Sequence, residues 1–310
     1  MSSAVKTVAV PDDRNGQRLD NFLTLELKGL PRSVIYKLIR TGQVRVNGGR
    51  SKPQRKLISG DQVRIPPVRR QEQVRPGIPE AQIAALRQRV IYQDPNIMVL
   101  DKPAGLAVHA GSGLPYGLID IARAAWPDSR LELVHRLDRD TSGCLVLSRN
   151  RQTLLSLQDQ FRSRQVSKSY LCLLMGRLPE PLMEIDIPLS RPQEKGGERI
   201  VVADPQGKPA LSRFRVLEQF STSDYVEVEL ITGRTHQIRV HARELGHPLA
   251  GDEKYGDREF NKRLNRRGLK RLFLHAHRLE LPEINDGSLL LDAPLPPDLR
   301  QLLDRLSGRK

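Results

Sequence analysis

The string HRLDRDTSG, from His135 to Gly143, gathers side chains that could do chemistry in nine residues. It holds two carboxylates and two guanidinium groups between two apolar stretches, residues 133–134 and 144–147. We therefore expect a tight turn at the end of a strand, because Asp-Thr-Ser-Gly is favourable turn sequence. Carboxylates can act as nucleophiles or move protons, so the turn is a candidate site. The same residues also fit a surface ion pair between Arg136 and Asp138 that has no part in catalysis.

A second candidate is the string TGRTHQIRVHARELGHP, residues 232–248. Its apolar residues recur at helical spacing and predict a buried stripe: Ile238, Ala242 and Leu245. His236, Arg239 and Arg243 share another face, because residues three and four apart are neighbours on a helix. That cationic face could bind phosphates or fix a carboxylate, and it could equally be a solvated surface. The histidine spacings match no zinc motif, so we expect no metal site.

Two further strings carry weaker signals. Lys168-Ser169-Tyr170 begins a predicted strand, where Tyr170 fits either the core or a flat ring that stacks on a base. Residues 101–113 are glycine-rich, but no helix start follows them directly, so a phosphate-binding loop is a poor fit. The chain also lacks the GxGxxG and P-loop patterns, and we expect no nucleotide cofactor.

The elements that position these strings fall into two parts. Residues 1–16 are a polar lead-in, and residues 17–66 form a compact unit in which two amphipathic helices precede two short strands. Residues 67–80 are proline-rich with little periodicity, which is typical of a linker. Residues 81–310 hold many short strands and fewer helices, predicted near 154–161, 235–245 and 297–306. The sequence predicts an α+β fold with a largely antiparallel sheet.

Charge and composition narrow the function classes. The 310 residues carry a net charge of +15, and residues 1–80 alone hold 16 Lys and Arg against 7 Asp and Glu. This imbalance favours a polyanionic partner bound mainly by the N-terminal part. The longest apolar run is about five residues, too short for a membrane span, and two cysteines exclude a disulfide scaffold. We expect a cytoplasmic protein that contacts nucleic acid and no membrane.

In their order along the chain, KPAGLAVH, HRLDRDTSG, KSYLCLLMG and GRTHQIRVHARELGHPLAGDEKYG resemble the motifs of pseudouridine synthases. Residues 17–66 resemble an S4-type RNA-binding domain. The resemblance implies a small S4-type α/β domain followed by a synthase domain on a largely antiparallel mixed sheet. It implies isomerisation of uridine to pseudouridine by base flipping, at several uridines of large-subunit ribosomal RNA, with no cofactor. The oligomeric state is open from the sequence, and we take a monomer as the default.

Residue roles follow from the same resemblance. Asp138 would be the single catalytic aspartate, Arg136 would fill the gap left by the flipped uridine, and Tyr170 would stack on the uracil. Arg239 would pair with Asp138 to keep it ionised and oriented, with Arg234 the alternative partner. Two more residues would contact the substrate, Lys168 and His135. The residues expected to bind RNA in the N-terminal unit are Arg32, Lys37, Arg40 and Arg45.

Two other function classes stay open at this point. A protein that only grips RNA would also explain the basic N-terminal unit, but not the three strings around Asp138, Tyr170 and Arg239. A carboxylate-dependent RNA glycosidase or hydrolase would need a second acid. Asp140 is available in the sequence, but two residues along in a turn it fits a capping role better.

Overall fold

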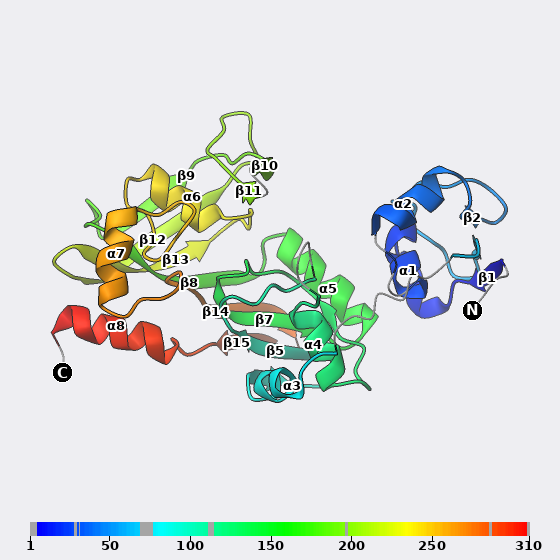
Figure 1. Cartoon of the computed structure of the whole chain (residues 1–310), viewed down its shortest axis with the longest axis horizontal. Coiled ribbons are helices and arrows are strands. Elements are labelled where there is room, and N and C mark those ends of the chain that lie inside the picture. Colours follow the sequence, from blue (N-terminus) through cyan, green and yellow to red (C-terminus); the bar gives the residue numbers. More distant parts are fainter. Residues whose placement is uncertain are drawn as a thin grey trace. The chain divides into compact units, whose positions relative to one another are not determined.

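The structure is a computed structural model of the chain, and it describes residues 5–27, 30, 32–68, 77–110, 115–195, 198–284 and 287–308 (Figure 1). The chain divides into two compact units, residues 1–77 and 78–310. The division falls inside the range 67–80 that the sequence analysis assigned to a linker, of which residues 69–76 lie outside the described part. No helix in the described residues is long and apolar enough to cross a membrane.

The first unit packs two helices against a three-stranded sheet. Its elements are β1 (Lys6–Ala9), a 3-10 turn (Asp12–Arg14), α1 (Leu19–Glu26), α2 (Arg32–Arg40), β2 (Arg45–Val46) and β3 (Gln62–Ile65). The sheet order is β1-β3-β2, and both pairings are antiparallel. The apolar faces of both helices join one core, as their spacing predicts. Residues 1–16 are more than a lead-in, because β1 pairs with β3 along its whole length.

The second unit is built on one large sheet. Its strands are β4 (Val90–Gln93), β5 (Ile97–Lys102), β6 (Glu132–Leu133), β7 (Ser142–Ser148), β8 (Ser167–Met175), β9 (Leu182–Asp186), β12 (Leu211–Gln219), β13 (Ser223–Leu230), β14 (Leu274–Ile284) and β15 (Gly287–Asp292). A separate hairpin joins β10 (Gln193–Lys195) and β11 (Glu198–Ile200). The helices are α3 (Glu80–Arg87), α4 (Leu118–Ala125), α5 (Arg151–Arg162), α6 (Gln237–Glu244), α7 (Arg258–Arg266) and α8 (Pro297–Ser307).

The strand order is β4-β5-β7-β14-β8-β13-β12-β9, with β15 on β14 and β6 on β7. Within the described strands of this sheet, the β7–β14 pair is the one parallel pairing, so the predicted α+β fold with a largely antiparallel mixed sheet is confirmed. This pairing needs glycine at 143. A Cβ there would lie 2.2 Å from the carbonyl oxygen of Ala276, and the residue has a φ of +110°. Gly143 ends the HRLDRDTSG string, so the string is fixed to the middle of the sheet.

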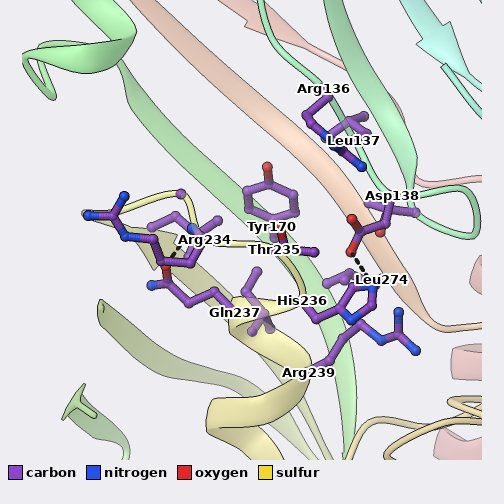
Figure 2. A pocket seen from close by; sticks show the side chains of 14 residues that line it. Arg136, Leu137, Asp138, Tyr170, Arg234, Thr235, His236, Gln237, Arg239 and Leu274 are labelled. Carbon is purple, nitrogen blue, oxygen red and sulfur yellow. Dashed lines mark hydrogen bonds and ion pairs between the residues drawn. The ribbon is translucent and has the colours of Figure 1, made fainter. Parts of the chain in front are cut away.

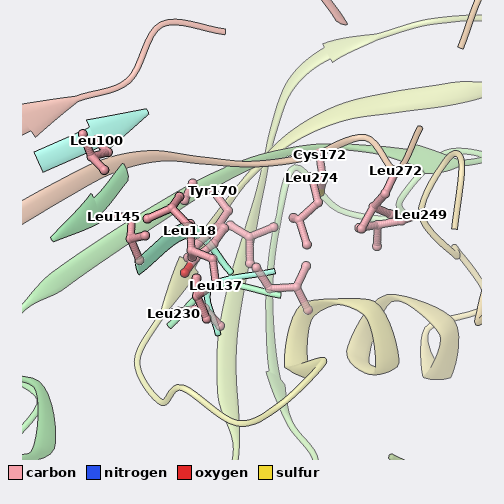
Figure 3. Close-up of a cluster of buried hydrophobic side chains, with 14 of the residues drawn as sticks. Leu100, Leu118, Leu137, Leu145, Tyr170, Cys172, Leu230, Leu249, Leu272 and Leu274 are labelled. Carbon is pink, nitrogen blue, oxygen red and sulfur yellow. The ribbon is translucent and has the colours of Figure 1, made fainter. Parts of the chain in front are cut away.

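Both faces of the sheet are buried, and the alternation along β5 illustrates this. Met98 and Leu100 point into the cluster covered by α3, α4 and α6, whereas Ile97 and Val99 point into the cluster covered by α5. Figure 3 shows Leu100 within the first of these clusters. Farther along the sheet, α7 and α8 pack on Leu173 and Phe273. The continuous apolar runs in the sequence therefore reflect strands covered on two sides.

Three helices of the second unit were not predicted, namely α3, α4 and α7. The helix α4 begins one residue after Gly117, close behind the glycine-rich string, so the expectation that no helix start follows that string was wrong. In α7 only Phe260 and Leu264 are buried, which gives too few apolar positions for a periodic signal.

Candidate active site

A pocket opens where the turn before β7, the strand β8 and the start of α6 meet (Figure 2). Its lining combines polar and apolar side chains from residues 136–138, Thr141, Tyr170, Leu230, residues 233–239 and Leu274. Three strings that the sequence analysis singled out therefore meet in one place. Among the described residues that line this pocket, Asp138 is the only carboxylate.

The turn that carries Asp138 is held in place by the buried side chains of Leu137 and Lys102. Leu137 is buried in the main cluster, so its neighbours Arg136 and Asp138 project toward the pocket and solvent. The ammonium of Lys102 donates hydrogen bonds to the carbonyls of Arg139, Leu106 and Pro103 at 2.8, 2.8 and 2.9 Å. The turn is thus anchored to β5 by a buried side chain.

Lys102 is completely buried. Burial lowers the pKa of its ammonium to about 7, and the carboxylates of Asp140 and Asp138 oppose this shift. Three carbonyl acceptors need three N–H donors, which only the charged form supplies. The protonated form is therefore the one that holds the turn in place.

Tyr170 lies on β8 with its ring in the pocket wall, next to the space that Asp138 faces (Figure 2). The strand is central, flanked by β14 and β13, where Tyr170 is opposite Ala276 and Val228. Burial, and then the negative charge of Asp138, raise the pKa of its phenol. Tyr170 is part of the core and of the pocket at once, so the two interpretations of its position do not exclude each other.

The loop before α6 is held by one buried amide. Gln237 accepts hydrogen bonds from the Thr232 hydroxyl at 2.8 Å and the Arg234 N–H at 3.0 Å. Its amide nitrogen, Nε2, donates to the Leu211 carbonyl and the Ser212 hydroxyl. These bonds fix the loop that places His236 at the pocket, in a left-handed conformation with φ 56°. A non-glycine residue in this region costs about 1–2 kcal/mol, which the surrounding bonds offset.

The imidazole of His236 faces the carboxylate of Asp138, with its Nε2 3.9 Å from Asp138 Oδ2. Its Nδ1 lies 2.8 Å from the hydroxyl of Tyr255, which accepts the N–H of Val201 at 2.9 Å. Because that hydroxyl accepts from Val201, we assign its own proton to the bond with Nδ1. The ring proton of neutral His236 then sits on Nε2 and faces Asp138. Burial lowers the pKa of His236, against the opposing charge of Asp138, which favours this neutral form.

Arg239 does not form the expected pair with Asp138. Its guanidinium donates two hydrogen bonds to Asp252, from Nε at 2.7 Å and from Nη2 at 2.8 Å. It also lies over the ring of Tyr255, 4.9 Å from the centroid. Burial disfavours its charge, but Asp252, and more weakly Asp138, outweigh burial and raise the pKa of Arg239. Asp138 therefore acts on Arg239 through space, while the direct contacts belong to Asp252.

The other two arginines of the pocket lie nearer to solvent. Arg136 is exposed at the rim, and Arg234 is half-buried with its Nε donating to the carbonyl of Pro209 at 3.2 Å. Neither has a recorded ion pair to Asp138 in the described residues. The alternative that Arg234 is the direct partner of Asp138 therefore fails together with the first choice.

Two residues expected to bind substrate lie outside the pocket lining. His135 accepts the Val146 N–H at its Nε2, at 3.1 Å, and stacks on Phe161. Burial lowers the pKa of His135 to about 3, so it is neutral. Lys168 donates to the carbonyl of Val166 at 3.2 Å and is buried. Both side chains stabilise the strands around the site instead of lining it.

The residues expected to bind RNA in the first unit are all exposed: Arg32, Lys37, Arg40 and Arg45. Three of them lie on α2, whose apolar side faces the core of that unit. In the described residues no group of three or more His, Cys, Asp or Glu lies close enough to hold a metal ion.

The sequence analysis missed the roles of His236, Tyr255 and Asp252. His236 was placed on a cationic helix face, but it precedes α6 and turns toward Asp138 through its left-handed backbone. Tyr255 and Asp252 stand in the string GDEKYG, which was noted without assigning its residues a role. Spacing could not reveal their place, because they reach the pocket from a loop beyond α6.

Comparisons with known proteins identify the family of the chain. Residues 96–244 match the family model described as RNA pseudouridylate synthase, and residues 17–63 match the S4 domain. A protein of Salmonella typhi named ribosomal large subunit pseudouridine synthase C is 46% identical over 314 residues, covering 99% of this chain and 98% of its own. A protein of the same name from Haemophilus influenzae is 45% identical and covers 100% and 98%.

Among solved structures, human RNA pseudouridylate synthase domain containing 4 matches with a TM-score of 0.62 and 29% identity, over 73% of this chain and 96% of its own. The matched family region contains Asp138, Tyr170 and the start of α6, which are the parts that build the pocket. The chain belongs to the RNA pseudouridylate synthase family and is an isomerase that converts uridine in RNA to pseudouridine.

Proposed function

We propose that the chain isomerises several uridines of large-subunit ribosomal RNA, and that Asp138 is the catalytic carboxylate. The observation that carries the residue assignment is the single carboxylate among the described residues of the pocket lining, which also holds the Tyr170 ring and three arginines. The substrate assignment is supported by the names of two relatives that match nearly the whole chain.

The reaction sets the requirements for this pocket. The bond from the ribose C1′ to N1 of uracil breaks, the base turns, and a bond from C1′ to C5 forms. A proton leaves C5 and N1 carries one in the product, so the net change adds and removes no atoms. One ionised carboxylate can serve as nucleophile or take up a proton in such a sequence. Asp138 is 21% exposed, which leaves its oxygens accessible to a base that enters the pocket.

Base flipping explains the neighbours of Asp138. Taking a nucleotide out of its stack costs a few kcal/mol, and stacking on an aromatic ring recovers about 1–3 kcal/mol. Tyr170 supplies that ring, and burial keeps it fixed. Arg136 is exposed at the rim, where its side chain can occupy the place that the base leaves. Arg234 is placed to contact a phosphate beside the target.

The first unit adds affinity for the RNA. Arg32, Lys37, Arg40 and Arg45 present positive charge to the phosphate backbone, as the match to an S4 domain supports. We propose a monomer as the active form. A ribosomal RNA substrate supports the proposal of a cytoplasmic enzyme.

A glycosidase would release uracil from the same pocket, but it would need a second acid for the leaving group. Asp140 is bonded to Arg139 at 3.0 Å and is not among the lining residues. Asp252 is committed to Arg239. The isomerase therefore fits the available carboxylates better than a glycosidase does.

The test uses unmodified transcripts of large-subunit ribosomal RNA and the full chain. Carbodiimide labelling followed by primer extension should reveal pseudouridine at a few positions, with no loss of mass from the RNA. Free uracil in the supernatant would contradict isomerisation. Modification of transfer RNA alone, under the same conditions, would contradict the proposed substrate.

A further inference from the structure

A basic segment of the second unit has no part in the pocket described above. The unit holds 35 Lys and Arg against 30 Asp and Glu. Residues 254–271 hold eight Lys and Arg against two acids, so the rest of the unit has 27 against 28. The whole positive excess of the second unit therefore lies in these 18 residues, which contain α7.

The few acids in this segment do not neutralise it. Asp257 caps α7, and its side chain accepts the N–H of Phe260 at 2.7 Å. Glu259 pairs with Lys262 at 2.7 Å in a fully solvated geometry, which contributes little. Arg258 and Arg266 are exposed, and in the described residues they have no recorded ion pair. Uncompensated charge on a helix surface is a binding feature for a polyanion.

The charges line a groove instead of being scattered. One side of the groove is formed by Asp252, Glu253, Lys254 and Gly256, where the exposed Glu253 carboxylate offsets one positive charge. The other side is the face of α7 that presents Arg258, Lys262 and Arg266. These positions are spaced by four residues, so they share one helix face. Arg263, which lies over the ring of Phe260, points elsewhere and is not part of the groove.

The groove is rigidly joined to the wall of the pocket. Asn261 of α7 accepts the Gly251 N–H at 2.8 Å and donates to the Asp252 carbonyl at 2.9 Å. Asp252 lines the groove, and its carboxylate holds Arg239, which lines the pocket. The buried Asp252–Arg239 pair therefore links the groove to the pocket.

We propose that this groove binds the phosphate backbone of the RNA that flanks the target uridine. The inference rests on the RNA substrate proposed above and adds a second contact surface besides the first unit. The arginine and lysine side chains on this face of α7 can each pair with a phosphate. Contacts of this kind position a nucleic acid without reading its sequence. Binding there would set the direction in which the flanking strand leaves the pocket.

The experiment compares two double variants of the full chain that remove the same charge from the same helix region. Arg258→Gln with Arg266→Gln removes two groove residues. Arg263→Gln with Arg267→Gln is the control, because both residues are exposed and outside the groove lining. Melting temperatures of both variants establish that the fold is kept, and the binding probe is an unmodified large-subunit ribosomal RNA transcript at several salt concentrations.

We expect the groove variant to bind about tenfold more weakly and its salt slope to fall by about 1–2, since each lost phosphate contact removes about 0.7–0.9. The loss should appear in KM more than in kcat. The control should bind within about twofold of the wild type. Equal losses of RNA affinity in both variants would contradict a groove-specific contact and would show that only the overall charge matters.

Two further outcomes separate this inference from the proposed function. If the groove variant bound free RNA normally but failed on assembled ribosomal particles, the groove would contact an acidic protein and the inference would be wrong. If the wild type formed no pseudouridine in this RNA while the groove variant still lost binding, the proposed substrate would fail and the groove would stand.

Discussion

Two aspartates lie on either side of the same pocket wall, and their surroundings differ sharply. Asp252 has no exposed side-chain surface, and it accepts two hydrogen bonds from Arg239 and the N–H groups of Lys254 and Tyr255 at 2.9 and 3.0 Å. Asp138 is 21% exposed, and the nearest group that can carry positive charge, His236, is 3.9 Å away. A carboxylate whose lone pairs are all occupied supports structure, whereas one with accessible oxygens can react.

The difference also appears in electrostatics. Burial disfavours ionised Asp252, but its hydrogen bonds and the charge of Arg239 outweigh burial and lower its pKa. Asp252 is therefore ionised at any pH where the enzyme works, and it carries no proton to donate. Arg239, the cation that the resemblance assigned to Asp138, pairs instead with Asp252 behind the pocket. There it stabilises the wall that positions His236 and α6.

The largest effect on stability is expected from Arg239→Met, which breaks the buried pair. It leaves Asp252 without its partner, and removing one member of a buried ion pair costs about 3–5 kcal/mol. We expect a loss of that size in the free energy of unfolding, measured with urea. The displaced wall should also lower the single-turnover rate about hundredfold at saturating RNA.

The matched control is Arg243→Met, four residues farther along α6 and exposed. It should change stability by less than about 0.5 kcal/mol and leave the single-turnover rate nearly unchanged. If both variants lost the same stability, the pair between Arg239 and Asp252 would not be what stabilises this part of the fold.

A smaller effect is expected from His236→Asn, which probes the Asp138 side. Asparagine tolerates the left-handed backbone, so the change removes the imidazole without adding strain. Losing the N–H that faces Asp138 should reduce the rate about tenfold, the size of one weak charge-assisted contact. The rate is measured in single turnover, and the RNA affinity serves as control. An unchanged rate would mean that His236 does not help to orient Asp138.

The smallest effect on activity is expected at His135, three residues before Asp138 but outside the pocket lining. His135→Gln keeps an acceptor for the Val146 N–H, and turnover should fall less than about fivefold. A rate loss as large as that of Arg239→Met would place His135 in the pocket after all.

The same variant should change the response of stability to pH. In the folded protein His135 has a pKa of about 3, below the ordinary 6.5, so the unfolded chain takes up a proton first as the pH falls. Stability from this residue is complete above pH 6.5 and declines toward pH 3. Between pH 7 and 5 the wild type should lose about 2 kcal/mol more than His135→Gln in urea unfolding. Parallel curves would show that His135 is not held neutral.

Much of the fold could be predicted because the strands and main helices carry strong apolar patterns. The alternation in residues 225–231 and the helical spacing of Ile238 and Ala242 are local signals, and β13 and α6 follow them. The helix α7 has only two buried residues, so its position depends on tertiary contacts that no local pattern records.

The site divides in the same way. Asp138, Tyr170 and Arg239 were found because each stands in a string of unusual composition. The partner of Arg239 was predicted wrongly, since spacing cannot choose between Asp138 and Asp252, which are 114 residues apart in the chain. His135 and Lys168 were assigned to the substrate because they neighbour site residues, but their side chains bond to strand backbone.

The central claim is that Asp138 alone supplies the catalytic carboxylate, and Asp138→Asn tests it most directly. The variant keeps the shape of the side chain, so its melting temperature and its affinity for the RNA transcript should match the wild type. In single turnover with carbodiimide detection, we expect the rate of pseudouridine formation to fall by about 1,000-fold or more, as when a catalytic group is removed. A folded, RNA-binding Asp138→Asn variant that kept more than a few per cent of the wild-type rate would contradict the account.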